Sequence, residues 1–349
     1  MRAAHRAALA ALAVSAALVT AIPAQAAPAG SGAGSAASAK KLKGATFAVI
    51  GDVPYGAAQI AAFPTMIDQL NADPDVSLVL HLGDIKNGSS VCSDDYFSLI
   101  RSDVDRFVDP LVYTIGDNEW TDCHRANNGS YNPLERLAAV RKVFFDRPGQ
   151  SLGRHPENLS TDAAAGFPED VRLVRQSVQF ASLHVVGSDN SLLPWTGNTT
   201  ATPEQAAEES ARTADVLSLI SRTFDHARRE HSKAVVLALQ ADMFDPTAGT
   251  PTAEGFGAFT PIVRAIADES VRFGRPVYLF NGDSHLYNDD KPLAPGSSWL
   301  GFYGAQAAPN LTRVTVDGSN SATKDWLKVT IDPASPAVLS WERVPYTGL

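Results

Sequence analysis

Basic residues are scarce in this 349-residue sequence, and their scarcity excludes a class of partner. There are 29 lysine and arginine residues against 38 aspartate and glutamate residues, a formal net charge of −9 at pH 7. Because binding to bulk nucleic acid depends on neutralising phosphates with basic side chains, we expect no such partner. A small phosphorylated substrate is compatible with this charge, since a bound metal ion can supply positive charge locally.

Long apolar runs are also few. The only one, Ala8–Ile22, lies near the start and is short for a spanning helix of ~20 residues. Arg2 and Arg6 precede it, and the small-x-small site Ala24–Ala26 follows. These three parts in order favour a cleaved signal peptide over residues 1–26 rather than a membrane anchor. The sequence therefore predicts a secreted or extracytoplasmic protein with no stable membrane span.

The segment after this predicted signal lacks the residues that form a core. Residues 27–43 are mostly alanine, glycine and serine with a few lysines, a composition typical of a flexible linker. No second linker and no repeat of fixed period follows. We therefore expect residues 44–349 to form one domain.

The chain has only two cysteines, Cys92 and Cys123, and both lie in the part that is predicted to be exported. An even count in an oxidising compartment favours a disulfide over two free thiols. Closing the loop between them would stabilise the fold by ~3–4 kcal/mol in the chain-entropy model.

Short apolar runs rich in valine, isoleucine and leucine predict strands that are buried on both faces of a sheet. Five such runs stand out: Thr46–Ile50, Leu78–Leu82, Leu111–Ile115, Ala234–Leu239 and Val277–Phe280. Partial alternation predicts a hairpin over 171–186, and the tail offers three further strands at 311–316, 327–331 and 338–344.

Helix-like segments separate these runs. They span 57–70, 96–107, 133–145, 203–230 and 258–273. Pro203 after Thr202 is typical of the first turn of a helix. Because strand and helix alternate in the first half, we expect parallel βαβ units. The predicted fold class is α/β, a four-layer αββα sandwich of two mixed sheets flanked by helices.

The same dipeptide, Gly-Asp, follows four of the apolar runs, three of them immediately and the fourth after Asn281. The four pairs are Gly51-Asp52, Gly83-Asp84, Gly116-Asp117 and Gly282-Asp283. One such pair is usually a turn or a helix cap. Four pairs at strand ends are different, because the carboxyl ends of parallel strands face one crevice where ligands bind. Carboxylates that converge there repel one another unless cations neutralise them, so we expect a centre with two metal ions.

The order of these motifs resembles the calcineurin-like metallophosphoesterase superfamily, which includes the purple acid phosphatases. The family pattern is D-x-H, G-D, G-N-H-[DE], a lone histidine after a strand, and G-H-x-H. The counterparts here are Gly51–Tyr55, Gly83–Lys86, Gly116–Glu119, Leu239–Asp242 and Gly282–His285. The resemblance implies two divalent metal ions and hydrolysis of a phosphate ester.

Three residues fall on the family's metal ligands without change in type: Asp52, the metal-bridging Asp84, and His285. Pro54 stands where the family has a histidine ligand. Tyr55 beside it is a candidate replacement, because a tyrosine ligates metal in purple acid phosphatases, although from the second motif.

The remaining positions exchange nitrogen ligands for oxygen. Asp117 takes the place of the ligand asparagine, Gln240 (or Asp242) that of one histidine, and Asp283 that of another. Oxygen-rich sites suit Mn²⁺, Mg²⁺ or Ca²⁺ better than Zn²⁺ or iron, so we predict a harder metal than the family's usual ones.

Asn118 stands where the family's acid-acting histidine belongs, and by this position it is a candidate catalytic residue and metal ligand. The exchange of histidine for asparagine puts the usual protonation of the leaving group on another residue. His124, just beyond the third motif, is a candidate general acid. Lys86 is a candidate to hold a phosphate oxygen as a point charge. A Cys92–Cys123 disulfide would join the loops after the second and third motifs and hold His124 near the site. Asn190 is a weaker candidate for substrate contact.

Two other functions compete with a hydrolase that uses a metal-activated water. Gly282-Asp283-Ser284 resembles the start of a GDSL serine hydrolase, but that motif belongs on the first strand rather than near the end. A secreted binding protein that kept the fold and lost turnover is the stronger rival, because three of the family's ligand histidines are replaced. The sequence does not distinguish mono- from diesters and is silent on oligomeric state.

Overall fold

The structure is a computed structural model that describes residues 46–318 and 325–348. The predicted signal peptide 1–26 and the predicted linker 27–43 lie outside the described residues. The described residues belong to one unit, Leu42–Leu349. Within the described ranges, no helix is both long and apolar enough to cross a membrane.

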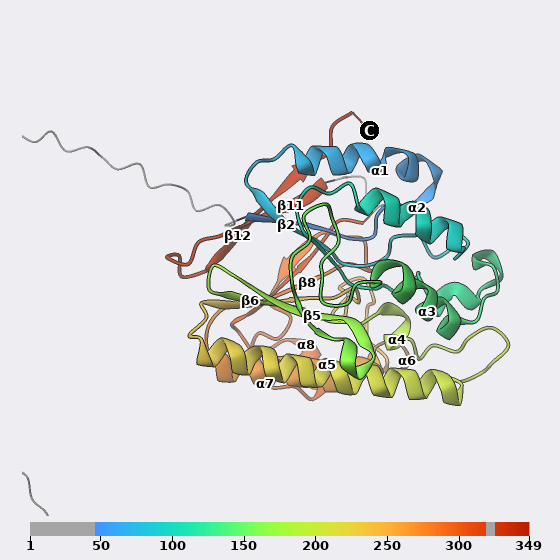
Figure 1. Cartoon of the computed structure of the whole chain (residues 1–349). Coiled ribbons are helices and arrows are strands. Elements are labelled where there is room, and N and C mark those ends of the chain that lie inside the picture. Colours follow the sequence, from blue (N-terminus) through green and yellow to red (C-terminus); the bar gives the residue numbers. More distant parts are fainter. Residues whose placement is uncertain (1–45, 319–324, 349) are drawn as a thin grey trace, which may run out of the picture. The chain divides into compact units, whose positions relative to one another are not determined.

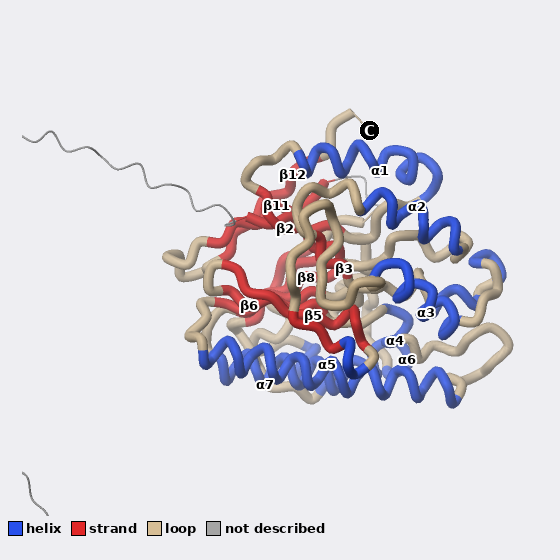
Figure 2. Tube along the Cα trace, viewed as in Figure 1, coloured by secondary structure: helices blue, strands red, loops and turns tan. Residues whose placement is uncertain are grey.

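Twelve strands in the described residues form two mixed sheets (Figures 1 and 2). The five-stranded sheet has the order β12-β11-β1-β2-β3, in which β1, β2 and β3 are parallel and β11 and β12 are antiparallel to their neighbours. Its strands are β1 (Thr46–Ile50), β2 (Val76–His81), β3 (Leu111–Tyr113), β11 (Asp325–Ile331) and β12 (Leu339–Pro345).

The seven-stranded sheet has the order β4-β5-β6-β7-β8-β10-β9. Its centre, β6-β7-β8-β10, is parallel, and both edges are antiparallel. Its strands are β4 (Ser160–Asp162), β5 (Phe167–Arg175), β6 (Val178–Ser182), β7 (Ala234–Ala238), β8 (Val277–Asn281), β9 (Asn288–Asp290) and β10 (Leu311–Thr315).

Strand β1 shows why such a sheet needs apolar residues on both faces. Phe47 and Val49 point into the core between the two sheets. Ala48 and Ile50 belong to a second core that also contains Phe63 of helix α1. Because successive side chains of a strand alternate between faces, an all-apolar run such as this one is buried on both sides.

Helices cover the outer face of each sheet. The helices α1 (Gly56–Asn71), α2 (Asp94–Val104) and α3 (Pro133–Phe144) pack on the five-stranded sheet, and α5 (Pro203–Arg229), α7 (Thr260–Phe273) and α8 (Ser298–Tyr303) pack on the other (Figure 1). The short helices are α4 (Gly187–Asn190) and α6 (Ala253–Phe256), and the 3-10 turns are η1 (Thr121–His124), η2 (Ala126–Asn128), η3 (Ala163–Ala165) and η4 (Gly257–Phe259). The layers run helix, sheet, sheet, helix, which confirms the predicted fold class.

The long helix α5 begins where the sequence predicts. The Thr202 side chain accepts a hydrogen bond from the Gln205 backbone N–H, and the Gln205 side chain accepts one from the Thr202 N–H. This capping box satisfies two donors that the first helical turn leaves unpaired, and Pro203 occupies the first turn without loss of a hydrogen bond.

A buried ion cluster joins α3 to the seven-stranded sheet. Glu169 on β5 is fully buried and contacts both Arg141 of α3 and the His184 ring, whose Nδ1 lies 2.8 Å from Glu169 Oε1. Burial acts to raise the pKa of Glu169, but the hydrogen bond from His184 and the charge and hydrogen bond of Arg141 outweigh it and lower that pKa. Burial also lowers the pKa of His184, so the lasting charge in this cluster is that of Arg141. The cluster therefore contributes stability while Glu169 is ionised.

Candidate metal centre

The four Gly-Asp turns meet at the carboxyl ends of β1, β2, β3 and β8, as the sequence predicts. Ligand atoms of Asp52, Asp84 and His285 lie within 4.8 Å of one another, and so do those of Asp84, Asp117 and Asp283. Asp84 belongs to both groups. Two neighbouring groups that share one carboxylate match the arrangement that a pair of metal ions requires.

The glycines of two turns are required by close packing. A Cβ at Gly116 would lie 2.1 Å from Asp84 Oδ1, and a Cβ at Gly282 would lie 2.3 Å from Asp52 Oδ2. Each of these glycines therefore gives room to an aspartate from a different turn. The repeated dipeptide follows from this packing, because one turn's missing side chain leaves space for another turn's carboxylate.

The first group surrounds the hydroxyl of Tyr55. This hydroxyl donates to Asp84 Oδ2 at 2.9 Å, and lies 3.5 Å from Asp52 Oδ1 and 3.3 Å from His285 Nε2. His285 Nε2 in turn lies 3.2 Å from Asp52 Oδ1. The Tyr55 hydroxyl thus lies among the ligand atoms of the first group, next to Pro54, which replaces the family's histidine. The group offers carboxylate oxygen, phenol oxygen and imidazole nitrogen to one cation.

The second group is held by backbone and hydroxyl donors. The Asp242 backbone N–H donates to Asp283 Oδ2 at 3.2 Å, and the Ser188 hydroxyl donates to Asp117 Oδ2 at 2.9 Å. The Asp283 N–H donates to Asp52 and so connects the two groups. The carboxylates are therefore oriented by the chain itself.

Gln240 faces the site with its amide nitrogen. Its Oε1 accepts a hydrogen bond from the Gly187 N–H at 2.6 Å, and this fixes which end of the amide points away. The Nε2 atom then lies 3.3 Å from both Asp84 Oδ2 and Asp117 Oδ1. Gln240, which the sequence predicts to be a metal ligand, is thus a hydrogen-bond donor to the two carboxylates in the structure. The alternative ligand, Asp242, pairs with Arg313 at 2.6 Å instead.

Asn118 has the same orientation. Its Nδ2 donates to Asp84 Oδ2 at 2.7 Å and to the Tyr55 hydroxyl at 3.1 Å, and its backbone N–H lies 3.3 Å from Asp84 Oδ1. In this arrangement Asn118 positions the shared carboxylate, rather than ligating a metal or transferring a proton as the sequence predicts.

The electrostatics of the site favour cations. Burial raises the pKa of Asp84 well above its usual range, and the neighbouring carboxylates, Asp117 foremost, raise it further. The pKa of Asp283 is raised by burial and by Asp117 in the same way. Burial also raises the pKa of Glu119, which is fully buried beside them. The donor set, rich in carboxylate oxygen and poor in nitrogen, fits hard divalent cations.

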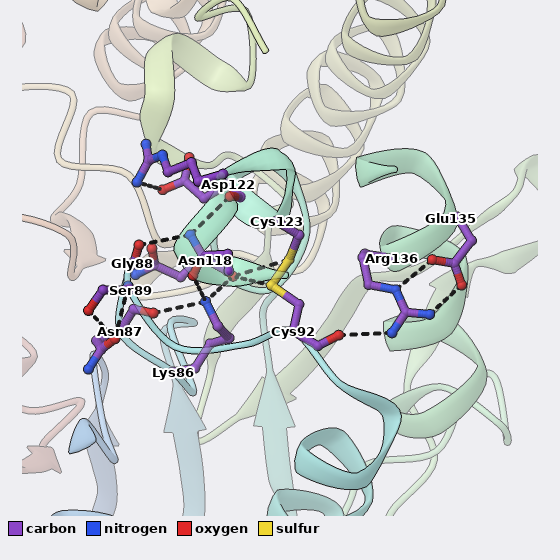
Figure 3. The surroundings of a disulfide bond; sticks show 12 residues. Lys86, Asn87, Gly88, Ser89, Cys92, Asn118, Asp122, Cys123, Glu135 and Arg136 are labelled. Atoms are coloured by element: carbon purple, nitrogen blue, oxygen red, sulfur yellow. Dashed lines mark hydrogen bonds and ion pairs between the residues drawn. A yellow bond between two sulfur atoms is a disulfide. The ribbon is translucent and has the colours of Figure 1, made fainter. Parts of the chain in front are cut away.

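Lys86 is placed behind the site, and this corrects its predicted role. Its ammonium group is buried and donates to the backbone oxygens of Asn87 and Asn118 at 2.8 Å and to Asn128 Oδ1 at 3.2 Å (Figure 3). Burial lowers the pKa of Lys86 to about 8. Because all three donors are used, Lys86 connects the loops after the second and third motifs rather than binding phosphate.

The predicted disulfide between Cys92 and Cys123 is confirmed, with a Cα–Cα distance of 5.9 Å. It joins the loop before α2 to the turn η1, beside the Lys86 contacts (Figure 3). The second and third motif loops are thereby connected twice, by a covalent bond and by a buried ammonium group.

The structure does not favour His124 as a general acid. Its Nδ1 accepts a hydrogen bond from the Thr196 N–H at 2.9 Å and lies 2.7 Å from the Thr196 hydroxyl. Burial lowers the pKa of His124 to about 4, so the ring is neutral at pH 7. The neutral His124 ring, held by Thr196 far along the chain, does not carry the second ring proton that a general acid gives to the leaving group.

One segment that contacts the site carries only a weak sequence signal. Gly187 begins a turn in which Ser188, Asp189, Asn190 and Ser191 all have positive φ, between 52° and 74°. Such a left-handed run costs ~1–2 kcal/mol per residue, so the surroundings must hold it in place.

The contacts of this turn show what holds it. Ser188 donates to Asp117 and Asp122, while Asn190 is fully buried and binds Arg212 and Thr213. Asn190 is therefore structural, and the predicted substrate contact is wrong. In the sequence, this turn is indicated only by the run Gly-Ser-Asp-Asn after a predicted strand. That run predicts Asn190 as the contact, whereas the residue that contacts the site is Ser188.

Two facing mixed sheets with helices outside carry carboxylates that converge at the strand ends. Residues 45–177 match the family model for calcineurin-like phosphoesterases. The match supports the predicted resemblance to the metallophosphoesterase superfamily over this segment. The matched segment contains the first three motifs.

Solved structures with a related arrangement are distant in sequence. One is GAP50, the anchor in the inner membrane complex of Plasmodium, with 8% identity and a TM-score of 0.45 over 87% of this chain and 89% of that chain. Another is the purple acid phosphatase PPD1 from yellow lupin (Lupinus luteus) seeds, with 10% identity and a TM-score of 0.44. That comparison covers 85% of this chain and 51% of the lupin chain. No curated protein matches the sequence.

Proposed function

We propose that this chain is an exported, metal-dependent phosphoester hydrolase that holds two divalent cations. The observation that carries the proposal is Asp84, which belongs to two groups whose ligand atoms each lie within 4.8 Å of one another. Asp52, His285 and Tyr55 would complete one cation site, and Asp117 and Asp283 the other. When bound, such cations neutralise phosphate oxygens and lower the pKa of water.

The chain's own residues orient these ligands. Three donors, the Tyr55 hydroxyl and the amides of Asn118 and Gln240, converge on Asp84 Oδ2. They hold the shared carboxylate in one rotamer, which is what a pair of ions at fixed separation requires.

The reaction needs no covalent contribution from the protein. The oxygen of water bonds to phosphorus, the bond from phosphorus to the ester oxygen breaks, and the alcohol leaves with a proton that derives from water. The products are the alcohol and phosphate for a monoester.

Metal analysis combined with activity assays tests the proposal. Chelated protein is reloaded with Mn²⁺, Mg²⁺, Ca²⁺ or Zn²⁺ and assayed with p-nitrophenyl phosphate and bis(p-nitrophenyl) phosphate. We expect about two ions per chain and hydrolysis with one of the first three, whereas Asp84→Asn abolishes hydrolysis. Asp95→Asn, an exposed aspartate in the first turn of α2, is the matched control. Failure of every metal to support hydrolysis would refute the proposal.

The export part of the proposal has its own test. The Cys92–Cys123 disulfide fits an oxidising compartment. Sequencing the N-terminus of protein recovered outside the cytoplasm should show cleavage after residue 26. Recovery of the uncleaved chain from the cytoplasm would contradict export and leave the hydrolase proposal standing.

A second function is favoured by one specific observation. The amides of Asn118 and Gln240 satisfy Asp84 without a metal ion, as a site that has lost turnover would allow. The same assay separates the two functions. A binding protein hydrolyses neither ester, whether it takes up metal ions or remains folded without them.

A further inference from the structure

A cavity of about 110 Å³ lies beside the second cation group. Ser188 and Asp189 of the left-handed turn line one part of it, Asp245 and Phe256 line another, and Asp283 of the metal centre lies at its border. The cavity and the second cation group share Asp283, so a phosphate held at the metal centre would have this cavity beside it.

The size of the cavity limits what the ester group can be. It is smaller than the ~150 Å³ cavity that accepts benzene. A head group of a few heavy atoms fills such a volume.

The charge of the lining residues further limits which leaving groups the cavity can bind. Four aspartates line the cavity, and among the described residues that line it there is no lysine or arginine. Asp242 is neutralised by Arg313, and Asp283 belongs to the cation group. Asp189 and Asp245 are left to face a ligand.

These two aspartates each keep an oxygen available. Asp189 Oδ1 accepts from the Ala258 N–H at 3.0 Å, and Asp245 Oδ1 accepts from the Thr247 N–H and hydroxyl at 2.7 Å. In the described part of the chain, the Oδ2 atom of neither residue accepts a hydrogen bond. Both carboxylates can therefore face a positive charge while their local turns remain intact.

Aromatic rings complete the lining. Phe256 and Phe259 also line the cavity, and Phe256 packs on Trp299 with ring centroids 5.5 Å apart. The faces of aromatic rings attract ammonium groups, by ~0.5–2 kcal/mol depending on exposure. Carboxylates and rings around one small volume are the usual environment for such a cation.

We propose that the cavity between the Gly187–Ser191 turn and the 242–259 segment binds the leaving group of the substrate, and that this group is a small alcohol carrying an ammonium charge. This inference rests on the proposed hydrolase function. Asp189 and Asp245 would determine specificity by charge, and a leaving group with extra anionic charge would be rejected.

A pair of isosteric substrates tests the inference. Choline phosphate and 3,3-dimethylbutyl phosphate have the same shape and differ only in the positive charge. With Mn²⁺-loaded protein, we expect kcat/KM to be about tenfold higher for the cationic ester, as one ion pair or cation–π contact would give. A ratio of one or less in the unmutated protein would overturn the inference.

Charge-neutral variants test the residues. Asp189→Asn should lower that ratio about threefold or more, and it suits the left-handed backbone, since asparagine tolerates positive φ. Asp245→Asn is the second variant, in case the first does not fold. Glu342→Gln, on an exposed part of β12, removes one negative charge elsewhere and should keep the ratio. Equal ratios in all four proteins would refute the assignment of these aspartates.

The inference can fail separately from the proposed function. Hydrolysis of p-nitrophenyl phosphate with no preference for the cationic ester refutes only the inference. If no ester is hydrolysed, the proposed function fails, and calorimetry with choline and with 3,3-dimethylbutanol still tests the cavity. Tighter binding of choline that Asp189→Asn weakens supports it, and equal binding of the two alcohols overturns it.

Discussion

Replacing Tyr55 by phenylalanine tests whether its hydroxyl is a metal ligand or only a hydrogen-bond donor. The hydroxyl lies between Asp84, Asp52 and His285, at 2.9, 3.5 and 3.3 Å from their nearest atoms. If it completes the first cation site, Tyr55→Phe removes one donor from that site and none from the second. We expect one of two Mn²⁺ sites to weaken by about 10–100-fold, the usual loss when a supporting group of a metal site is removed.

The apoprotein should respond in a second, independent way. A hydrogen bond between uncharged groups contributes ~0.5–1.5 kcal/mol, and the raised pKa of Asp84 favours its neutral form without metal, so the metal-free variant should be less stable by about that amount. Calorimetric titration with Mn²⁺ measures the first effect, and denaturant unfolding in the presence of chelator measures the second. Tyr303→Phe is the control, because it removes a buried hydroxyl that donates to Met243 O at 2.5 Å.

Two outcomes separate the roles of the hydroxyl. Weakening of the first cation site alone by Tyr55→Phe, with both sites unchanged in Tyr303→Phe, supports ligation, because loss of a hydrogen bond to the shared Asp84 alone would weaken both sites. Unchanged affinity at both sites, with only the apoprotein destabilised, would show that Tyr55 donates to Asp84 and does not ligate, and our placement of the first cation would be wrong.

Three further predictions concern other parts of the molecule. Because the pKa of Glu169 is lowered to about 2 in the folded state, its contribution to stability is fully present above the unfolded value of 4.5 and is lost as pH falls from there through about 2. Glu169→Gln should cost ~3 kcal/mol at pH 7 and flatten this acid dependence in urea unfolding. Replacing both Cys92 and Cys123 by serine should lower the unfolding free energy by ~3–4 kcal/mol, and a loss below ~1 kcal/mol would contradict the loop-closure argument. Gln240→Glu replaces an amide donor by an oxygen that can ligate, so divalent-cation affinity should rise about tenfold in calorimetry, and weaker binding would place the second cation elsewhere.

The fold was predictable because most elements carry a strong local pattern. Strand β1 is an uninterrupted apolar run whose bounds are as predicted, and α5 has a proline and a capping threonine at its start. The three-residue strands β4 and β9 were missed, because a strand of three residues is too short for periodicity to be visible.

The metal centre was predictable only in part, because position and orientation are different properties. The Gly-Asp turns fixed which carboxylates meet, since strand ends converge in a parallel sheet. Which end of an amide faces them depends on a distant donor, the Gly187 N–H for Gln240. The roles of Lys86 and His124 were decided by their partners, Asn128 and Thr196, which no spacing in the sequence connects to them.

The crowding of carboxylates leads to a last prediction, on the protons of the metal centre. Without cations, burial and mutual repulsion raise the pKa values of Asp84 and Asp283, so protons occupy the pocket. Cations must displace those protons, and their apparent affinity should therefore rise with pH. Titration with Mn²⁺ in two buffers of different ionisation enthalpy, at pH 6 and pH 8, measures the protons released. Release that is larger at pH 6 fits a centre that exchanges protons for metal. Zero release at both pH values would mean that the carboxylates are already ionised, and that hydrogen bonds from the Tyr55, Asn118 and Gln240 side chains suffice to stabilise their charge.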